Sequence, residues 1–401
     1  MADIPVYPLF NNTYRLYRVS PLHHGGNPLL SERALRTHAK RLRDQLKGDN
    51  VRGVQVDFGT IEGAMPALGP LELCQWDMLG DEDAWIDRHR QLLDPDASQL
   101  SSVVAPDRAR GIEISLEYDG KHEYNALLLR DPDSTRSPSG FTSLPLLMVK
   151  MPAPIRDVFL NYLRTSFDAH VTPLKLAPTF LTNTLEAFLR HLAAPTSTQS
   201  IPDVIRQLQL QLSFPAAAPY LRHIDVSISG LEIAEFVKRG KLLQRGTEAP
   251  FATSMQTYIS RHLALDLSHV GSQISRIICN PFTIQTDRIK IMNPDITVDA
   301  SFSDESNAPD GSSSQLAVQE LYASLVKEAT GSGRFLPVSA LENREETPLS
   351  NSSAGRRGRK RAISNPTPGA AVAKRTKQKG KQRGRRAQTE NVDYDVHMED
   401  A

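Results

Sequence analysis

The apolar and polar residues of this chain follow two different periods, one typical of strands and one typical of helices. In the first 150 residues, alternation of apolar and polar positions predicts strands. These strands are Thr13–Leu22, Val54–Phe58, Ile112–Tyr118, Tyr124–Leu129 and Leu144–Val149. The Asp119-Gly120 dipeptide predicts a tight hairpin turn between Ile112–Tyr118 and Tyr124–Leu129. Ser31 is expected to cap a helix in which Leu35, His38, Ala39, Leu42 and Leu46 share a face.

The second part of the chain begins after Pro152 and Pro154 and contains longer helical periods. Apolar residues three and four apart predict helices at Ile155–Phe167, Phe180–Leu192, Leu231–Lys238, Phe251–Leu263 and Gln315–Glu328. Strands are predicted at Leu208–Phe214, Ile224–Ile228, Gln273–Cys279 and Thr283–Ile291. Leu208–Phe214 alternates leucine with glutamine, which indicates an antiparallel strand with one buried face and one uncharged, wettable face.

These elements predict an α+β protein of two domains, each with a curved antiparallel sheet packed by helices. The expected domains are residues 1–150 and 151–330. Residues 331–401 are rich in Gly, Ser, Pro and charge, with too few apolar residues to offset chain entropy, so we expect a disordered tail. Asp131–Gly140, which carries Pro132 and Pro138, is expected to be a loop.

Candidate chemistry in the body of the chain is sparse. Cys74 and Cys279 are its two cysteines, too few for a zinc cage or a disulfide framework. The adjacent His23-His24 pair is interpreted as a polar turn, and the acidic run Asp81–Asp83, between Trp76 and Trp85, as a solvated loop or helix start. Both tryptophans are expected in the core. We find no catalytic, phosphate-loop or metalloprotease motif, and expect no enzyme, cofactor or metal.

The charge of the chain is divided unevenly. The formal net charge is only +1, yet residues 355–388 contain thirteen Lys and Arg and no acid. The chain is therefore an acidic body with a strongly basic tail, and not a uniformly basic protein. No run of eighteen apolar residues predicts a membrane span, and no secretory signal is visible.

The basic tail predicts nuclear import and weak, non-specific DNA contact. Two clusters, Arg356–Arg361 and Lys374–Lys377, are separated by twelve residues, a spacing that resembles a bipartite nuclear localisation signal read by importin. Two Arg-Gly-Arg units resemble AT-hooks but lack the usual following proline. The residues expected to act are Arg356, Arg357, Arg359, Lys360, Arg361, Lys374, Arg375, Lys377, Lys379, Lys381, Arg383, Arg385 and Arg386. Ser137, Thr347 and Thr367 precede prolines and are candidate phosphorylation sites.

Several phrases of the sequence resemble, in the same order, the inner-kinetochore CENP-L family. The strand Thr-Tyr-Arg-Leu-Tyr-Arg-Val-Ser-Pro-Leu at 13–22 is similar to the opening strand of that family. Further similar segments are Gly140–Leu147, Thr165–Leu174, Ile224–Ile228, His262–Leu267 and Asp287–Ile291. Residues 60–110 show no such resemblance, and the basic tail lies outside it and looks like a fungal-type elaboration.

The resemblance implies a non-enzymatic subunit of the constitutive centromere-associated network in the nucleus. Such a subunit pairs with a CENP-N family protein, contacts other inner-kinetochore proteins, and helps to attach the kinetochore to centromeric nucleosomes and DNA. In the family, late strands of the second domain contribute to the pairing. The resemblance therefore implies a partner interface that includes Ile274, Ile277, Ile284, Ile289 and Ile291.

A second hypothesis belongs to another class. The chain would then be a chromatin- or DNA-binding adaptor of another nuclear complex that acts through its basic tail. DNA retention that disappears with the tail would favour this hypothesis, whereas pairing with a CENP-N-type protein would favour the kinetochore. An enzyme of an unrecognised class is a third hypothesis, against which stands the lack of an assembled nucleophile–base or metal set.

Overall fold

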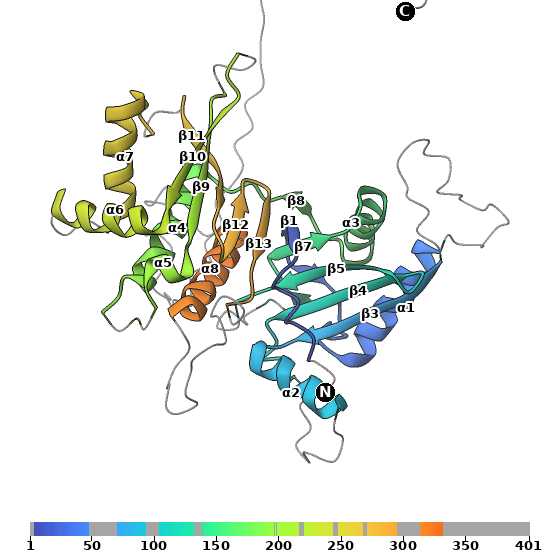
Figure 1. Cartoon of the computed structure of the whole chain (residues 1–401). Helices are drawn as coiled ribbons and strands as arrows, with labels where there is room; N and C mark the ends of the chain where they lie inside the picture. The colour runs from blue at the N-terminus through green and yellow to red at the C-terminus, as the bar shows by residue number, and fades with distance from the viewer. Residues whose placement is uncertain are drawn as a thin grey trace, which may run out of the picture. The chain divides into compact units, whose positions relative to one another are not determined.

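We describe a computed structural model of the chain (Figure 1). The residues it describes are 4–47, 70–93, 104–131, 137, 139–195, 197, 199–215, 220–243, 248–267, 271–294 and 313–331. The chain divides into two compact units, Met1–Asn343 and Arg344–Ala401, and every described residue belongs to the first. The predicted strand Val54–Phe58 and the predicted disordered tail lie outside the described residues.

One large antiparallel sheet organises the first unit. Its eleven strands follow the order β10-β9-β11-β12-β13-β1-β7-β5-β4-β3, and β8 pairs with β1 off this path. In Figure 1, β9, β10 and β11 lie together at the left, β12, β13 and β1 near the centre, and β7, β5, β4 and β3 follow toward the lower right. The strands are β1 (Thr13–Val19), β3 (Leu71–Leu79), β4 (Gly111–Tyr118), β5 (His122–Leu129), β7 (Leu146–Lys150), β8 (Val171–Pro173), β9 (Gln207–Ser213), β10 (His223–Ser229), β11 (Gln273–Ile278), β12 (Phe282–Gln285) and β13 (Arg288–Ile291). A separate two-stranded sheet pairs β2 (Leu22–His23) with β6 (Phe141–Thr142).

Helices pack on this sheet, so the predicted α+β class is confirmed. They are α1 (Glu32–Leu46), α2 (Glu82–Leu93), α3 (Ala153–Phe167), α4 (Pro178–Leu192), α5 (Ile201–Val204), α6 (Gly230–Leu243), α7 (Pro250–Leu263) and α8 (Ser313–Thr330). Six of them match predicted helices: α1, α3, α4, α6, α7 and α8. Within the described residues, no helix is long and apolar enough to cross a membrane. The predicted domain boundary near residue 150 stays a prediction.

Local sequence signals explain where several elements begin and end. The predicted Asp119-Gly120 turn lies between β4 and β5, and both residues have positive φ, 52° and 57°, with the Lys121 N–H donating to the Tyr118 carbonyl at 3.1 Å. Tyr118 pairs with His122, so Lys121 completes the connection. Ser31 caps α1 and accepts a hydrogen bond from the Ala34 N–H. The acidic run at 81–83 is a helix start, because Asp81 Oδ1 accepts a hydrogen bond from the Ala84 N–H at 2.9 Å.

The structure differs from the sequence prediction in one strand and contains another strand that was not predicted. Thr283–Ile291 is predicted as one strand but forms β12 and β13, which are joined by a turn at Thr286 and Asp287. The reason is a change of phase, since buried residues fall on even positions up to Ile284 and on odd positions from Ile289. The strand β3 is not predicted from the sequence. A register shift between Leu71 and Leu73 interrupts the alternation that marks a strand.

We call β1, β3, β4, β5 and β7 the N-terminal half of the sheet and β9 to β13 its C-terminal half. Helices cover these two halves on opposite faces. Residues of α1 and α3 pack with Trp76 and Ile114 on one face of β1, β3, β4, β5 and β7. Residues of α4 to α8 pack on the other face, against the buried leucines of β9 and the isoleucines of β11 to β13. As predicted, Leu208, Leu210 and Leu212 are fully buried while the glutamines between them face outward. In the described part of the chain, the outward face of β9 to β13 has no covering helix. The second face of the N-terminal half is partly covered, because Leu127 of β5 and Met148 of β7 pack in the same cluster as α8.

Side-chain hydrogen bonds connect α8 to β1 and to the end of β5, and a close backbone contact joins α6 to α7. The Arg18 side chain donates to the Glu328 carbonyl at the end of α8, and Tyr322 Oη of α8 donates to the Arg130 carbonyl after β5. At the crossing of α6 and α7, Gly240 lies directly against Pro250. A Cβ added at Gly240 would stand 1.7 Å from the Pro250 carbonyl oxygen, so this crossing requires glycine.

Candidate nucleic-acid interface

The uncovered face of the C-terminal half carries a group of cations. Strand alternation buries Ile289 and Ile291 of β13 and turns Arg288 and Lys290 to the opposite face. Register then places Arg15 of β1 opposite Arg288, and Thr13 opposite Lys290. Lys290 lies in turn opposite Thr283 of β12. Residues distant in sequence therefore meet in one basic sheet face, which we define as Arg15, Arg276, Arg288 and Lys290.

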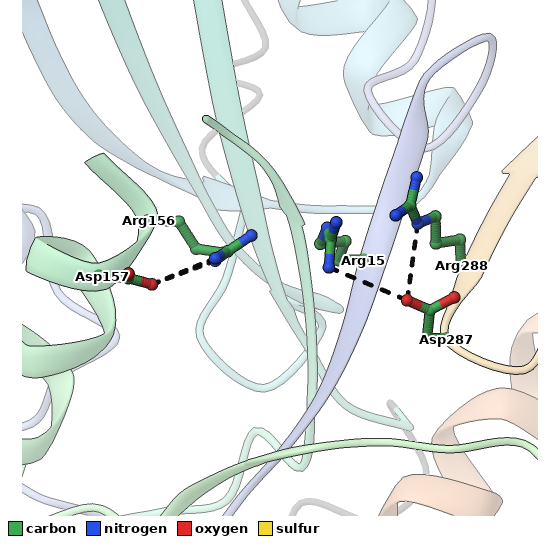
Figure 2. Close-up of polar contacts among 5 residues, drawn as sticks. All are labelled: Arg15, Arg156, Asp157, Asp287 and Arg288. Atoms are coloured by element: carbon green, nitrogen blue, oxygen red, sulfur yellow. Dashed lines mark hydrogen bonds and ion pairs between the residues drawn. The ribbon is translucent and has the colours of Figure 1, made fainter. Parts of the chain in front are cut away.

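Asp287 partly balances two of these cations. Its Oδ2 lies 3.5 Å from Arg288 Nε and 3.9 Å from Arg15 Nη1, as Figure 2 shows. Two guanidinium groups thus share one carboxylate, although their positions directly opposite each other are unfavourable for like charges. The surplus positive charge attracts anions.

A small cavity lies beside this face. It has a volume of about 170 Å³ and is lined by Thr13, Arg276, Thr283, Gln285, Arg288, Ile289 and Lys290. Arg276 Nε is buried and makes no hydrogen bond within the described residues. A phosphate group is an anion of suitable size, and guanidinium groups offer it paired N–H donors.

Helix α3 stands beside the basic sheet face on the same side of the sheet. Tyr17 of β1 packs in the cluster formed by α1 and α3, and alternation places Arg15 on this same side. Figure 2 shows Arg156 at the start of α3 with its side chain directed toward the region of Arg15. Arg156 is bound to Asp157 at 3.3 Å. The helix thus borders the basic face and does not cover it.

The residues predicted as a partner interface occupy a different place. Ile274, Ile277, Ile284, Ile289 and Ile291 are brought together, but all are at least nine-tenths buried in the core of this chain. Their strands are interior strands of the sheet, each paired on both sides. The interface stays a prediction, and these five side chains are part of the hydrophobic core of this chain.

The remaining predicted site residues are mostly outside the described part of the chain. Ser137 is described, and its Oγ accepts a hydrogen bond from the Ser143 N–H at 3.0 Å. Thr347, Thr367 and the thirteen tail cations lie beyond the described residues. His23 contacts the Phe141 ring. Among the described residues, no group of three His, Cys, Asp or Glu side chains could hold a metal ion.

The basic sheet face is not visible in the sequence because its members belong to separate strands. Arg288 and Lys290 are two positions apart, which is a recognisable signal that both lie on one face of a strand. Arg15 and Arg276 join them only through pairing of β1 with β13 and of β11 with β12. No local pattern gives that register.

The fold and this face are those of an α+β protein with a basic sheet surface. A family model for CENP-L, centromere protein L, matches residues 8–330, and the chain belongs to this family. It is a structural family of the inner kinetochore, whose members are nuclear, lie at the centromere and serve chromosome segregation. A search of curated protein sequences finds no match to the chain.

Proposed function

We propose that this chain pairs with a CENP-N-type subunit and helps to link centromeric DNA to the inner kinetochore. Family membership supports the kinetochore role. The observation that supports DNA linkage is the basic sheet face, where Arg276, Arg288 and Lys290 surround one cavity. Duplex DNA presents regularly spaced phosphates to such a surface, and binding through phosphates needs no base sequence.

Neutralising the basic sheet face is expected to weaken duplex binding. We choose Arg276→Gln, Arg288→Gln and Lys290→Gln together, because glutamine keeps most of the side-chain length on an outward face. If each cation neutralises one phosphate, the slope of log affinity against log salt becomes less steep by about 2.7. Fluorescence anisotropy with a labelled duplex between 50 and 200 mM salt measures this slope.

The matched control removes three cations from an exposed helix. Arg33, Arg36 and Lys40 are exposed on α1, and their replacement by glutamine changes the net charge equally. We expect this control to leave the slope nearly unchanged. Equal slopes for the two triple variants would contradict a specific role of the sheet face, and would favour the hypothesis that the basic tail alone holds DNA.

We place the pairing surface at the outer strand β10. In the described part of the chain β10 pairs with β9 alone, so its other edge offers free N–H and C=O groups to a partner strand. Leu221 precedes this strand and Leu231 follows it, and both are exposed, at 40% and 72%. An open strand edge with apolar residues at both ends suits a second protein chain.

Replacing Leu221 and Leu231 by aspartate is expected to weaken pairing at least tenfold. Each leucine loses its burial against the partner and gains a charge there. Because both side chains are exposed in this chain, its melting temperature should stay unchanged. Titration against a purified CENP-N-type subunit measures the affinity, and Leu316→Asp, an exposed leucine on α8, is the control. Undiminished affinity in the double variant would exclude this edge.

The basic tail completes the proposal. Its two clusters, Arg356–Arg361 and Lys374–Lys377, are assigned to importin binding and to weak, non-specific contact with DNA. This assignment depends on charge and spacing in the sequence.

A further inference from the structure

Two rows of outward residues cross the C-terminal half of the sheet and enclose the small cavity beside the basic sheet face. In one row, Arg276 of β11 lies opposite Gln285 of β12. In the other, Lys290 of β13 lies between Thr283 of β12 and Thr13 of β1. The rows are two residues apart, about 6.7 Å along a strand. The described residues that line the cavity therefore contribute three cations, two hydroxyl groups and one amide, and no acid.

The donors around this cavity lack acceptors. The Nε atoms of Arg276 and Arg288 are buried and make no hydrogen bond within the described residues. Arg288 lies 3.5 Å from Asp287, a carboxylate that it shares with Arg15. A buried donor without an acceptor is costly. An anion rich in oxygen would supply the acceptors that these guanidinium groups lack.

The cavity is open to solvent and has room for one phosphate group. Its volume is about 170 Å³, which equals the share of about five water molecules in the liquid. A phosphate group has four oxygens around one phosphorus atom. Thr13 is exposed, and the side chain of Arg288 is 43% exposed. A ligand can therefore enter the cavity without rearrangement of the core.

The charge of the cavity favours a phosphomonoester over a phosphodiester. Arg276, Arg288 and Lys290 carry three positive charges, and Asp287 offsets one of them, which leaves a surplus of two. A phosphomonoester such as phosphoserine carries about −1.5 to −2 at pH 7 and has three terminal oxygens. Each phosphodiester of DNA carries a single negative charge and has one terminal oxygen fewer. The monoester therefore matches both the charge of the cavity and its number of donors.

The lining also favours a protein over a nucleotide as the carrier of the phosphate. Among the described residues, no aromatic ring lines the cavity, and its apolar residue, Ile289, is 1% exposed. Unpaired bases are bound by stacking on aromatic side chains, and none is available at the cavity. The polar groups of Thr13, Thr283 and Gln285 instead suit the backbone of a peptide. Arginine clusters commonly recognise phosphorylated side chains of proteins.

We propose that this cavity binds a phosphorylated serine or threonine of a partner protein. Arg276 and Arg288 donate N–H groups to the terminal oxygens of the phosphate, and Lys290 supplies the third positive charge. The inference goes beyond DNA linkage and does not depend on it. Because duplex DNA requires the same three cations, the phosphorylated partner and DNA exclude each other at this place.

Three peptides of equal length test the class of ligand. Each has the sequence Ala-Gly-X-Gly-Ala with blocked ends and a fluorescent label, and X is phosphoserine, glutamate or serine. They are titrated with the full chain at 150 mM salt, and anisotropy measures the affinity. We expect the phosphoserine peptide to bind at least tenfold more tightly than the glutamate peptide, because a carboxylate has less charge and fewer oxygens. Equal affinity for these two peptides would overturn the proposal.

Protein variants locate the binding at the cavity. Arg276→Gln and Lys290→Gln are each expected to weaken the phosphoserine peptide at least fivefold, and their melting temperatures verify folding. The matched control, Arg222→Gln, removes an exposed arginine that precedes β10 and should retain full affinity. Every variant keeps the basic tail, so a difference between variants reports the cavity. An equal affinity of the control and both cavity variants would contradict the assigned site.

Competition distinguishes the sources of phosphate. Inorganic phosphate and a thymidine dinucleotide, which has a phosphodiester but no monoester, are each added to the complex with the phosphoserine peptide. We expect inorganic phosphate to displace the peptide only at a tenfold higher concentration, and the dinucleotide to displace it less well still. Displacement by inorganic phosphate at equal concentration would show a free anion as the ligand. Equal competition by the dinucleotide would overturn the monoester preference and leave DNA linkage standing.

Discussion

Replacing Gly240 by alanine is expected to destabilise the protein by about 3 kcal/mol. The added methyl group would meet the Pro250 carbonyl oxygen, which is backbone and cannot rotate away, so α6 and α7 must separate. The separation reopens packing between Phe236 of α6 and Phe251 of α7, whose ring centroids lie 6.1 Å apart. This cost exceeds the gain of about 1 kcal/mol in helix propensity when alanine replaces glycine.

Thermal unfolding measures the effect, with an expected fall in melting temperature of at least about 5 °C. Gly26→Ala is the matched control, because no atom lies within 4 Å of the Cβ that it would add. We expect the control to melt within about 1 °C of the unchanged chain. A higher melting temperature for Gly240→Ala would mean that helix propensity outweighs the close contact, and would contradict the tight α6–α7 crossing.

Replacing Ile289 by aspartate is expected to unfold the C-terminal half of the sheet. Ile289 is 1% exposed and lies between Tyr14 of β1 and Ile284 of β12. A carboxylate at this position would be buried without a partner, at a cost of several kcal/mol. The soluble yield and the melting temperature should both fall sharply, whether or not a partner protein is present.

The neighbouring residue provides the control. Lys290 belongs to the same strand but faces outward, so Lys290→Asp should fold normally and lose only anion binding. Circular dichroism and thermal unfolding of both variants compare the two faces of β13. If Ile289→Asp kept its melting temperature but lost the CENP-N-type partner, Ile289 would be an interface residue after all. That outcome would contradict the burial described above.

Elements with a strong local signal could be predicted from sequence. The β4–β5 hairpin follows from regular alternation and an Asp-Gly turn, and α1 follows from an apolar stripe and the Ser31 cap. The strand β3 could not, because its bulge near Leu71 destroys the alternation. The division of 283–291 into two strands is visible in the sequence, because the apolar residues change from even to odd positions between Ile284 and Ile289. A search for one continuous strand does not detect this change.

The charged rows of residues on the sheet could not be predicted for a different reason. Alternation shows that Glu113 and Glu117 share a side of their strand, but not that Glu123 lies directly opposite Glu117. Likewise, Arg288 and Lys290 indicate one basic face, but pairing with β1 is needed to add Arg15. Charge patterns within one strand are local, whereas a surface depends on register between strands that are far apart in sequence.

The position of β1 has a mechanical consequence. A force along the strands would load all the hydrogen bonds of β1 together in shear, whereas a force across them would peel the pairs one after another. β1 pairs with β13 through three residue pairs and with β7 through four, so its pairing with β13 is the shorter of the two. Arg18 of β1 donates to the Glu328 carbonyl of α8, and Tyr322 of α8 donates to the Arg130 carbonyl after β5, so α8 connects both places to the helices of the C-terminal half. The resistance of this protein to a pulling force therefore depends on the direction of the load.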